Sequence, residues 1–440
     1  MQKADCLPEL ELVEPLVSPF GPLTGARYSA TSPRRGLGRF ALEWVAGGSN
    51  SPGRAITRVG MRGVTSGSGR AIDDRARARL IAVAEGAERY SSGDFLGERR
   101  ILAASTELDG PAVDLGRIPR CSERELNTPG CPLRPLDPNA RIRWVHGIDL
   151  ASGQLTWVPA VMASYGVTGW LPAERFWCGI STGFAVHFDP LEALVGAIFE
   201  VIERDLNAVL WLQRLPVPLI PMTDLSEPAR YLLDWSARHF IDTYLFDATS
   251  DLGVPTVYCL QRAQYADHAY HVVAAAAARS ITKAAEKALL EVVGARGAFC
   301  SFTEEGIIED FSAMNNVLDG ARYMARSQLA EAFSFLTDGV RDRPTSERGS
   351  LPEGSAEALS VLVSALSRRG MCAIAVDRTP RELADVGLTA VNVVIPDLQP
   401  MSLRPLAQYR AHPRLYEAPV LMGYSSRSEE ELNPWPQPFL

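Results

Sequence analysis

Three segments carry apolar residues at the three- and four-residue spacing of an amphipathic helix: residues 72–92, 189–212 and 280–296. The second is the most fully specified, because Asp189 is a preferred N-cap residue and Pro190 suits the first helical position. At about 100° per residue, the apolar residues of this segment fall on one broad side of a helix. They are Leu191, Leu194, Val195, Ile198, Ile202, Leu206 and Val209.

Shorter runs rich in β-branched and other apolar residues predict strands. They cover residues 142–149, 154–162, 254–261, 270–276, 371–377 and 390–396. Ser152 and Gly153 separate the first two runs and are a hairpin signal. Because strands and helices are interspersed, the expected fold class is α/β (α+β).

The two ends of the chain differ from the middle. Residues 1–55 are rich in Pro, Gly, Ser and Arg, which predicts an irregular N-terminal extension with one short strand at 40–45. Residues 56–440 then form the main domain. Its last residues, 433–440, carry three prolines at alternate positions, which predicts an extended tail.

Composition excludes several classes of protein. The chain has 440 residues, of which 46% are hydrophobic and 22% charged, so it is neither collagen-like nor mainly disordered. A net charge of −8 argues against a general nucleic-acid binder. Its seven cysteines include no CxxC pair, which argues against a disulfide framework or a structural zinc site. The N-terminus lacks the features of a signal peptide, and no apolar run is long enough to span a membrane, so we expect a cytoplasmic protein.

Candidate chemistry lies on the polar faces of the predicted helices. The pattern A-x-x-E-x-x-E-R occurs in the first segment and again in the second. It places Glu85 and Glu88 on one face of the first helix. It likewise pairs Glu200 with Glu203 on the second helix, where Glu192 falls in the same sector. In the third segment Lys287 precedes Glu291 by one helical turn.

Two interpretations of these charges remain open. Glutamates at this spacing commonly form ordinary charge pairs on a solvated face, and Asp189 with Glu192 fits a capping box. Alternatively, the carboxylates converge and bind a divalent cation, which prefers oxygen ligands and is often completed by phosphates. No Walker loop occurs in the sequence, which excludes the P-loop mechanism. The glycine-rich residues 66–69, expected to form a loop before the first helix, could approach a phosphate.

Several of these segments resemble the YcaO-domain family. The similarity runs through GVTSGSGRAIDDRARARLIAVAEGAERYSSGDF, STGFAVHFDPLEALVGAIFEVIERD, AAEKALLEVVGAR and VDRTPRELADVGLTAVNVVIPDLQPMS. The terminal NPWPQPFL looks like the Pro-rich tail of the azoline-forming members. In order along the chain, the match covers roughly residues 56–440.

The resemblance implies a YcaO fold, in which mixed sheets and packed helices form a non-P-loop site for ATP and Mg²⁺. The residues that match the family's nucleotide-binding positions are Glu85, Glu88, Glu192, Glu200, Glu203, Arg204, Lys287 and Glu291. Those implied to hold the metal are Glu88, Glu200, Glu203 and Glu291. The prolines implied to help order the active site are Pro434, Pro436 and Pro438.

The implied activity is that of a cyclodehydratase. In such members the side chain of Cys, Ser or Thr adds to the preceding peptide carbonyl, ATP phosphorylates the resulting oxygen, and phosphate leaves. The product is a thiazoline or oxazoline in a ribosomally made peptide. The resemblance also implies a homodimer, an E1-like or ocin-ThiF-like partner that brings the leader peptide, and a flavin dehydrogenase that oxidises the ring.

The chain departs from the family pattern at four positions: Ala82, Ala197, Lys287 and Gly294. The glutamates are kept, which favours an active enzyme. Two alternatives stay open. The same ATP chemistry with another nucleophile would make a thioamide or a macroamidine, and loss of turnover would leave a non-catalytic scaffold subunit.

Overall fold

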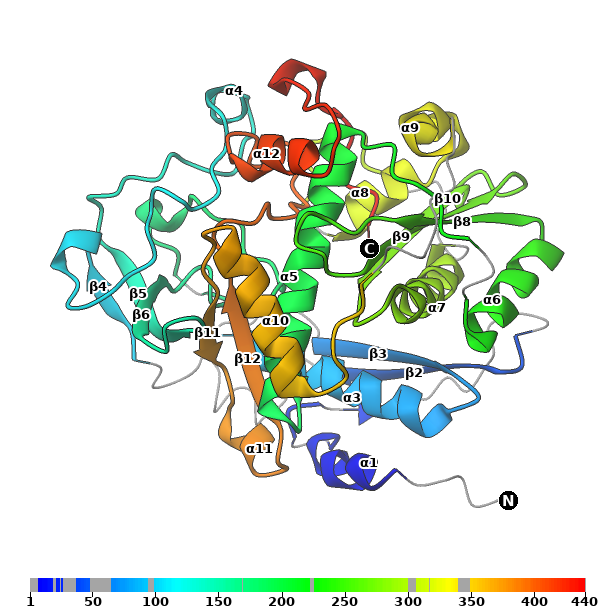
Figure 1. The fold of residues 1–440 in the computed structure, drawn as a ribbon, viewed down its shortest axis with the longest axis horizontal. Coiled ribbons are helices and arrows are strands. Elements are labelled where there is room, and N and C mark those ends of the chain that lie inside the picture. The colour runs from blue at the N-terminus through cyan, green and yellow to red at the C-terminus, as the bar shows by residue number, and fades with distance from the viewer. Residues whose placement is uncertain are drawn as a thin grey trace. The chain divides into compact units, whose positions relative to one another are not determined.

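The computed structural model describes residues 7–18, 21–23, 25–26, 37–47, 65–93, 99–167, 169–221, 225–299, 306–315, 317–338 and 349–439. The chain divides into two compact units. Unit 1 comprises Met1–Gly116, Leu136–Ile198 and Gly370–Ile395. Unit 2 comprises Arg117–Pro135, Phe199–Arg369 and Pro396–Leu440. The boundary falls inside the long helix α5 (Pro190–Gln213), so the chain passes from one unit to the other along this helix (Figure 1).

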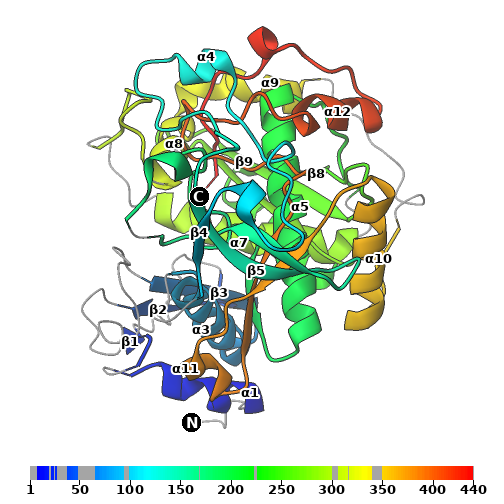
Figure 2. The ribbon, with the colours of Figure 1, turned by 90° about the vertical axis from the view of Figure 1, so that its left-hand side faces the viewer.

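A small antiparallel sheet in unit 1 carries the first predicted helix. Its strands are β1 (Gly25–Ala26), β2 (Phe40–Gly47) and β3 (Thr65–Ile72), in that order. Helix α3 (Arg75–Ser91) packs along β2 and β3 (Figure 2). The strand predicted at residues 40–45 is thus confirmed as part of β2.

Residues 66–69 do not form the expected loop; they lie within β3. The glycines serve packing instead. A Cβ atom at Gly67 would lie 2.0 Å from the carbonyl oxygen of Ala82, and one at Gly69 would lie 1.7 Å from that of Ala78. Only a residue without Cβ lets strand and helix approach this closely. The prediction was wrong because glycine is common both in turns and at close backbone contacts, and composition does not separate the two.

The second sheet of unit 1 has six antiparallel strands. The order is β4 (Ile101–Ala103), β5 (Ile142–Asp149), β11 (Ile374–Asp377), β12 (Thr389–Val394) and β7 (Phe184–His187), and β6 (Leu155–Pro159) pairs with β5. Helix α1 (Pro8–Val13) packs on α3, with Leu10 and Val13 in a buried cluster that also contains Leu383 of α11 (Arg381–Ala384). Part of the segment predicted to be irregular therefore belongs to the core of this unit.

Unit 2 is built on a three-stranded antiparallel sheet. Its order is β10 (His271–Ala277), β9 (Thr256–Ala263) and β8 (Ile241–Asp247). Helix α7 (Ile281–Phe299) packs on β9 and β10, and α6 (Glu227–Arg238) packs on β8 and α7. Every residue of β10 is buried, which explains its run of small apolar residues.

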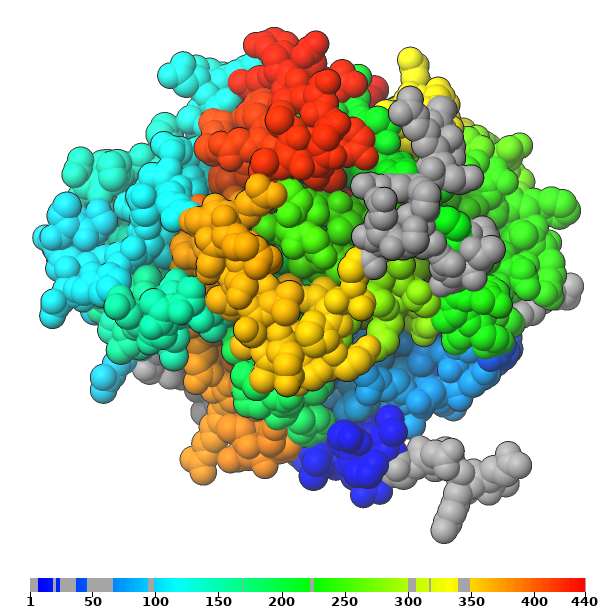
Figure 3. All heavy atoms as spheres, viewed as in Figure 1, coloured from blue at the N-terminus to red at the C-terminus, as the bar shows by residue number. Residues whose placement is uncertain are grey.

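Further helices of unit 2 are α4 (Glu123–Leu126), α8 (Val317–Met324), α9 (Ser334–Thr337), α10 (Ser355–Arg368) and α12 (Arg414–Leu421). Helix α10 buries Leu362 and Leu366 on one side, and its other side lies at the surface, where its spheres are visible in Figure 3. Within the described ranges, no helix is both long and apolar enough to cross a membrane.

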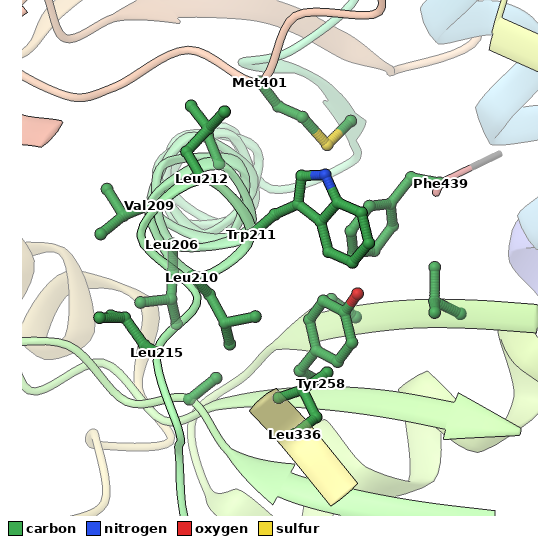
Figure 4. Packing of buried hydrophobic residues seen from close by; sticks show 14 of the residues in the cluster. Leu206, Val209, Leu210, Trp211, Leu212, Leu215, Tyr258, Leu336, Met401 and Phe439 are labelled. Carbon is green, nitrogen blue, oxygen red and sulfur yellow. The ribbon is translucent and has the colours of Figure 1, made fainter. Parts of the chain in front are cut away.

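The main core of unit 2 surrounds the C-terminal half of α5. Trp211 is fully buried, and Tyr258, Met401 and Phe439 lie around it in Figure 4. The last residue named, Phe439, belongs to the Pro-rich tail and is only 4% exposed. The tail is therefore part of the core of unit 2.

Most predicted elements are confirmed. The three helices are α3, α5 and α7, each beginning and ending within three residues of its predicted bounds. All six predicted strands are present, as β5, β6, β9, β10, β11 and β12. The pairing of β2 with β3 joins residues on the two sides of the predicted domain boundary at residue 56. The boundary itself stays a prediction.

Candidate functional site

Glu203 is the centre of the candidate site in unit 2. It lies on the polar side of α5, and its side chain is 16% exposed. Its Oε2 atom accepts a hydrogen bond of 3.0 Å from the backbone N–H of Ala277, the last residue of β10. The end of the central sheet therefore holds this carboxyl group in place.

The pKa of Glu203 is raised from its usual 4.5 to about 8. Burial is the largest cause, because it removes water from the charged form. The neighbouring carboxylates of Glu291 and Glu200 raise the pKa further, while Arg204 and the N–H of Ala277 lower it. Three carboxyl groups therefore crowd together, and one of them keeps its proton near neutral pH.

Arg204 lies next to these carboxylates without binding either one tightly. Its Nη2 atom is 3.8 Å from Oε1 of Glu200, and its Nε atom is 3.9 Å from Oε1 of Glu203. Its Nη1 atom is 3.8 Å from the sulfur of Met401. Both ion pairs are near the limit for direct contact, so an anionic ligand can recruit this guanidinium at little cost.

Helix α7 supplies the other predicted residues of unit 2. Glu291 lies near enough to Glu203 to raise its pKa, and Lys287 lies one turn earlier on the same helix. Both are exposed. The position of α7 follows from its opposite face, where Ala284, Ala288 and Val292 are buried, and from its packing against β9 and β10.

In unit 1 the glutamate pair of α3 is also held by a strand. Oε2 of Glu85 accepts hydrogen bonds from the backbone N–H of Ser68, at 2.8 Å, and from its hydroxyl, at 3.2 Å. Oε1 of Glu85 is 3.5 Å from Nη2 of Arg89. Glu88 lies one turn further along the same helix. Because β3 lies at the edge of the sheet as far as the structure describes it, Glu85 accepts from a backbone N–H that none of the described strands pairs.

Glu192 lies in the first turn of α5, in unit 1. The helix begins as predicted, because Oδ1 of Asp189 accepts a hydrogen bond of 2.9 Å from the N–H of Leu191. The backbone oxygen of Asp189 accepts the first helical bond from Ala193, at 3.0 Å. An acidic residue in a first helical turn is stabilised by the helix dipole, whatever further role it has.

The predicted ligands thus fall into two groups, one in each unit. Unit 1 holds Glu85, Glu88 and Glu192, and unit 2 holds Glu200, Glu203, Arg204, Lys287 and Glu291. In the part of the chain that the structure describes, no three His, Cys, Asp or Glu side chains form a ready-made metal site. The assignment of Glu88, Glu200, Glu203 and Glu291 to a metal stays a prediction.

The chemistry of the unit 2 group nevertheless fits a divalent cation. Carboxylate oxygens are the donors that Mg²⁺ prefers, and a bound cation would relieve the repulsion that Glu291 and Glu200 add to the effect of burial on the pKa of Glu203. Arg204 and Lys287 add cations of the kind that bind phosphate oxygens.

The Pro-rich tail packs within unit 2. The indole N–H of Trp211 donates a hydrogen bond of 3.0 Å to the carbonyl oxygen of Trp435, and the ring of Tyr258 meets that of Phe439 edge-on at 5.4 Å. Pro434 is exposed, whereas Pro436 and Pro438 are buried. A catalytic role for these three prolines stays a prediction.

Two contributors were missed in the sequence. Ser68 lies in the glycine-rich segment, and no apolar alternation there indicates the strand that holds it. No feature of the sequence indicates the role of the Ala277 N–H, because every residue except proline has a backbone N–H.

Comparisons with known proteins agree with the family resemblance of the sequence. The family model described as YcaO cyclodehydratase, ATP- and Mg²⁺-binding, matches residues 68–399. No curated protein sequence gives a match.

Three similar solved structures share the fold at low identity. A heterocyclase in complex with substrate and cofactor has a TM-score of 0.79 and 20% identity, over 98% of this chain and 57% of that one. YcaO from Methanopyrus kandleri, bound with AMPPCP and Mg²⁺, has a TM-score of 0.59 and 17% identity, over 83% and 84%. The E. coli microcin synthetase McbBCD complex contains a chain with a TM-score of 0.58 and 15% identity, over 86% and 88%. The chain spans little more than half the length of the first of these.

Proposed function

Because the chain belongs to the YcaO cyclodehydratase family, whose members bind ATP and Mg²⁺, we propose that it converts Cys, Ser or Thr residues of a ribosomally made precursor peptide to thiazoline or oxazoline. The observation that carries this proposal is the crowding of Glu200, Glu203 and Glu291 beside Arg204. Carboxylates held this close repel one another, and a bound divalent cation would relieve that repulsion.

The proposed reaction has three steps. The side-chain sulfur or oxygen of the substrate residue adds to the carbonyl carbon of the preceding peptide bond, and its proton leaves to solvent or a base. The oxygen that was the carbonyl then takes the γ-phosphoryl group of ATP, and ADP is released. The amide nitrogen loses its proton as a carbon–nitrogen double bond forms, and phosphate departs with the original oxygen. The net change is loss of water from the peptide and hydrolysis of one ATP.

The residues of unit 2 fit this chemistry. A bound Mg²⁺ would neutralise phosphate charge and orient the phosphoryl group for transfer. Glu200, Glu203 and Glu291 would hold it, and Arg204 and Lys287 would bind phosphate oxygens. Glu85, Glu88 and Glu192 remain the proposed nucleotide ligands of unit 1.

We further propose a protein partner, since the E. coli microcin synthetase is described as the McbBCD complex. An E1-like or ocin-ThiF-like protein would bind the leader peptide, and a flavin dehydrogenase would oxidise the ring. A homodimer of this chain is part of the same proposal.

Calorimetric titration with ATP, with and without Mg²⁺, tests the proposal directly. We expect heat of binding that depends on Mg²⁺. Absence of binding, both for the chain alone and for its co-purified complex, contradicts an ATP-dependent enzyme and favours a scaffold subunit. With a precursor peptide in hand, mass spectrometry separates loss of one water from incorporation of sulfur or formation of an amidine.

A further inference from the structure

The carboxylate face of α5 continues toward the tail. Successive residues of a helix are about 100° apart, so Glu203, Asn207 and Trp211 follow one another at intervals of one turn on the same face. Asn207 therefore lies between the carboxyl group of Glu203 and the indole that binds the tail.

The tail is anchored at the far end of this face. The backbone N–H of Asn433 donates a hydrogen bond of 2.8 Å to the carbonyl oxygen of Leu212, and Trp211 binds the carbonyl oxygen of Trp435. Phe439 then reaches Tyr258 on β9, as Figure 4 shows. These contacts keep the tail in register with the last turns of α5.

Three buried polar side chains around the tail have no partner among the described residues. Both carboxamide atoms of Asn207 are without a hydrogen bond, although the residue is 0% exposed. The same holds for both carboxamide atoms of Gln437, which is 3% exposed, and for the hydroxyl of Tyr258, which is 0% exposed. A buried polar group without a hydrogen bond is destabilising, so these five atoms, and Nδ2 of Asn433 in the tail, which is also unpaired, require an explanation.

The chemistry of these side chains restricts the kind of ligand that they could bind. All three are uncharged, and burial raises the pKa of the Tyr258 hydroxyl, so it stays protonated. A phosphate would call for cations or backbone N–H groups. A carboxamide offers one acceptor and two donors, which complement the N–H and C=O of a peptide group.

We propose that Asn207, Gln437 and Tyr258 bind the peptide backbone of the substrate, next to the residue whose amide is activated at Glu203. This assignment rests on the proposed function and specifies the substrate-binding part of that site. It makes the tail a wall of the peptide site through the side chain of Gln437.

The competing explanation is buried water, which also satisfies unpaired amides. Selective ¹⁵N labelling of asparagine, followed by NMR of the side-chain amides, separates the two. The probe is the capped dipeptide mimic N-acetylglycine N-methylamide, titrated into the full chain with and without Mg²⁺ and a non-hydrolysable ATP analogue. Asn315, an exposed residue whose Nδ2 bonds to the carbonyl of Ala313 at 3.1 Å, is the internal control.

We expect the Asn207 signals, assigned by their loss in Asn207→Leu, to shift along a binding curve while those of Asn315 stay still. Tyr258→Phe removes only the hydroxyl and keeps the ring against Phe439, so it should weaken binding of the probe about three- to tenfold. If Asn207→Leu does not fold, the side-chain amide signals of Asn207 are instead assigned as those whose chemical shifts change in Tyr258→Phe.

Asn207 signals that do not move, or that move without saturating as the probe is added, overturn the assignment. If Tyr258→Phe binds the probe with unchanged affinity, the proposed role of Tyr258 is wrong. Binding of Mg²⁺ and nucleotide is recorded in the same samples. Nucleotide binding without a response of Asn207 therefore rejects this inference alone, whereas absence of nucleotide binding rejects the proposed function.

Discussion

The backbone N–H of Ala277 donates a hydrogen bond of 3.0 Å to Oε2 of Glu203, and so ties the central carboxyl group of α5 to the end of β10. Ser68 does the same for Glu85, at the edge of β3, with an N–H bond of 2.8 Å. In both units a strand fixes a helical glutamate. Each of these carboxylates is thus oriented before any ligand arrives, which lowers the ordering cost of binding.

The raised pKa of Glu203 predicts a pH dependence of stability. Between about pH 4.5 and pH 8 the folded protein keeps a proton that the unfolded chain has lost. The stability contributed by this group is therefore complete below pH 4.5 and is lost as the pH rises to 8. Without Mg²⁺, Tm should fall over this range, and it should fall less in Glu203→Gln. An identical pH profile in both proteins contradicts the assignment, and binding of Mg²⁺ should release protons.

Glu203→Gln should abolish binding of Mg²⁺ and ATP with little loss of stability. The amide oxygen can still accept the N–H of Ala277, whereas the charge that attracts the metal is gone. Calorimetric titration measures the binding and thermal unfolding measures the fold. Glu331→Gln, at an exposed position of unit 2, is the control and should bind like wild type. Wild-type binding by Glu203→Gln would refute the convergent-carboxylate interpretation.

Two substitutions separate the structural and catalytic roles of the tail. Phe439 is 4% exposed and contacts Tyr258, so Phe439→Ala should lower the free energy of unfolding by about 3–5 kcal/mol. Pro434 is exposed, so Pro434→Ala should change stability by less than about 0.5 kcal/mol while reducing turnover. Urea unfolding and peptide turnover are the measurements. Full turnover in Pro434→Ala argues that this proline only leads the chain into the core.

Gly69→Ala tests the close contact of β3 with α3. A Cβ atom there would lie 1.7 Å from the carbonyl oxygen of Ala78, so strand and helix must separate. We expect a loss of about 1–3 kcal/mol or more in unfolding free energy. Gly38→Ala is the matched control, since nothing lies within 4 Å of its Cβ position. Equal stability of the two variants would show that β3 and α3 can move apart at Gly69 without loss of unfolding free energy.

Breaking the buried ion pair of Asp205 and Arg414 should cost much more unfolding free energy than breaking an exposed pair. Nη2 of Arg414 lies 2.9 Å from Oδ2 of Asp205 and 2.8 Å from Oδ1 of Asp251, and both partner side chains are 0% exposed. Asp205→Ala removes one of the two buried carboxylates around Arg414, together with the acceptor of the Gln399 N–H, and should cost about 3–5 kcal/mol.

The control for this pair is Asp385→Ala, whose partner Arg381 is 90% exposed; it should cost at most about 1 kcal/mol. Chemical denaturation at two salt concentrations checks both values. A cost below 1 kcal/mol for Asp205→Ala would mean that water enters the core at this point.

The sequence alone determined the helices, most strands and the family, because these depend on local periodicity and on motifs with fixed spacing. Asp189 does begin α5, and the glutamates at three-residue spacing do share helix faces. The spacing within one helix is set by its pitch, so no tertiary information was needed.

Only the tertiary structure decided what each side chain meets. Long-range pairing made residues 66–69 a strand, placed Ala277 against Glu203 and turned the Pro-rich tail into core. It also showed that Asn207, unremarkable in the sequence, is buried with its carboxamide unmet among the described residues. Burial and hydrogen-bond partners arise from segments far apart in the chain, and local composition carries no record of them.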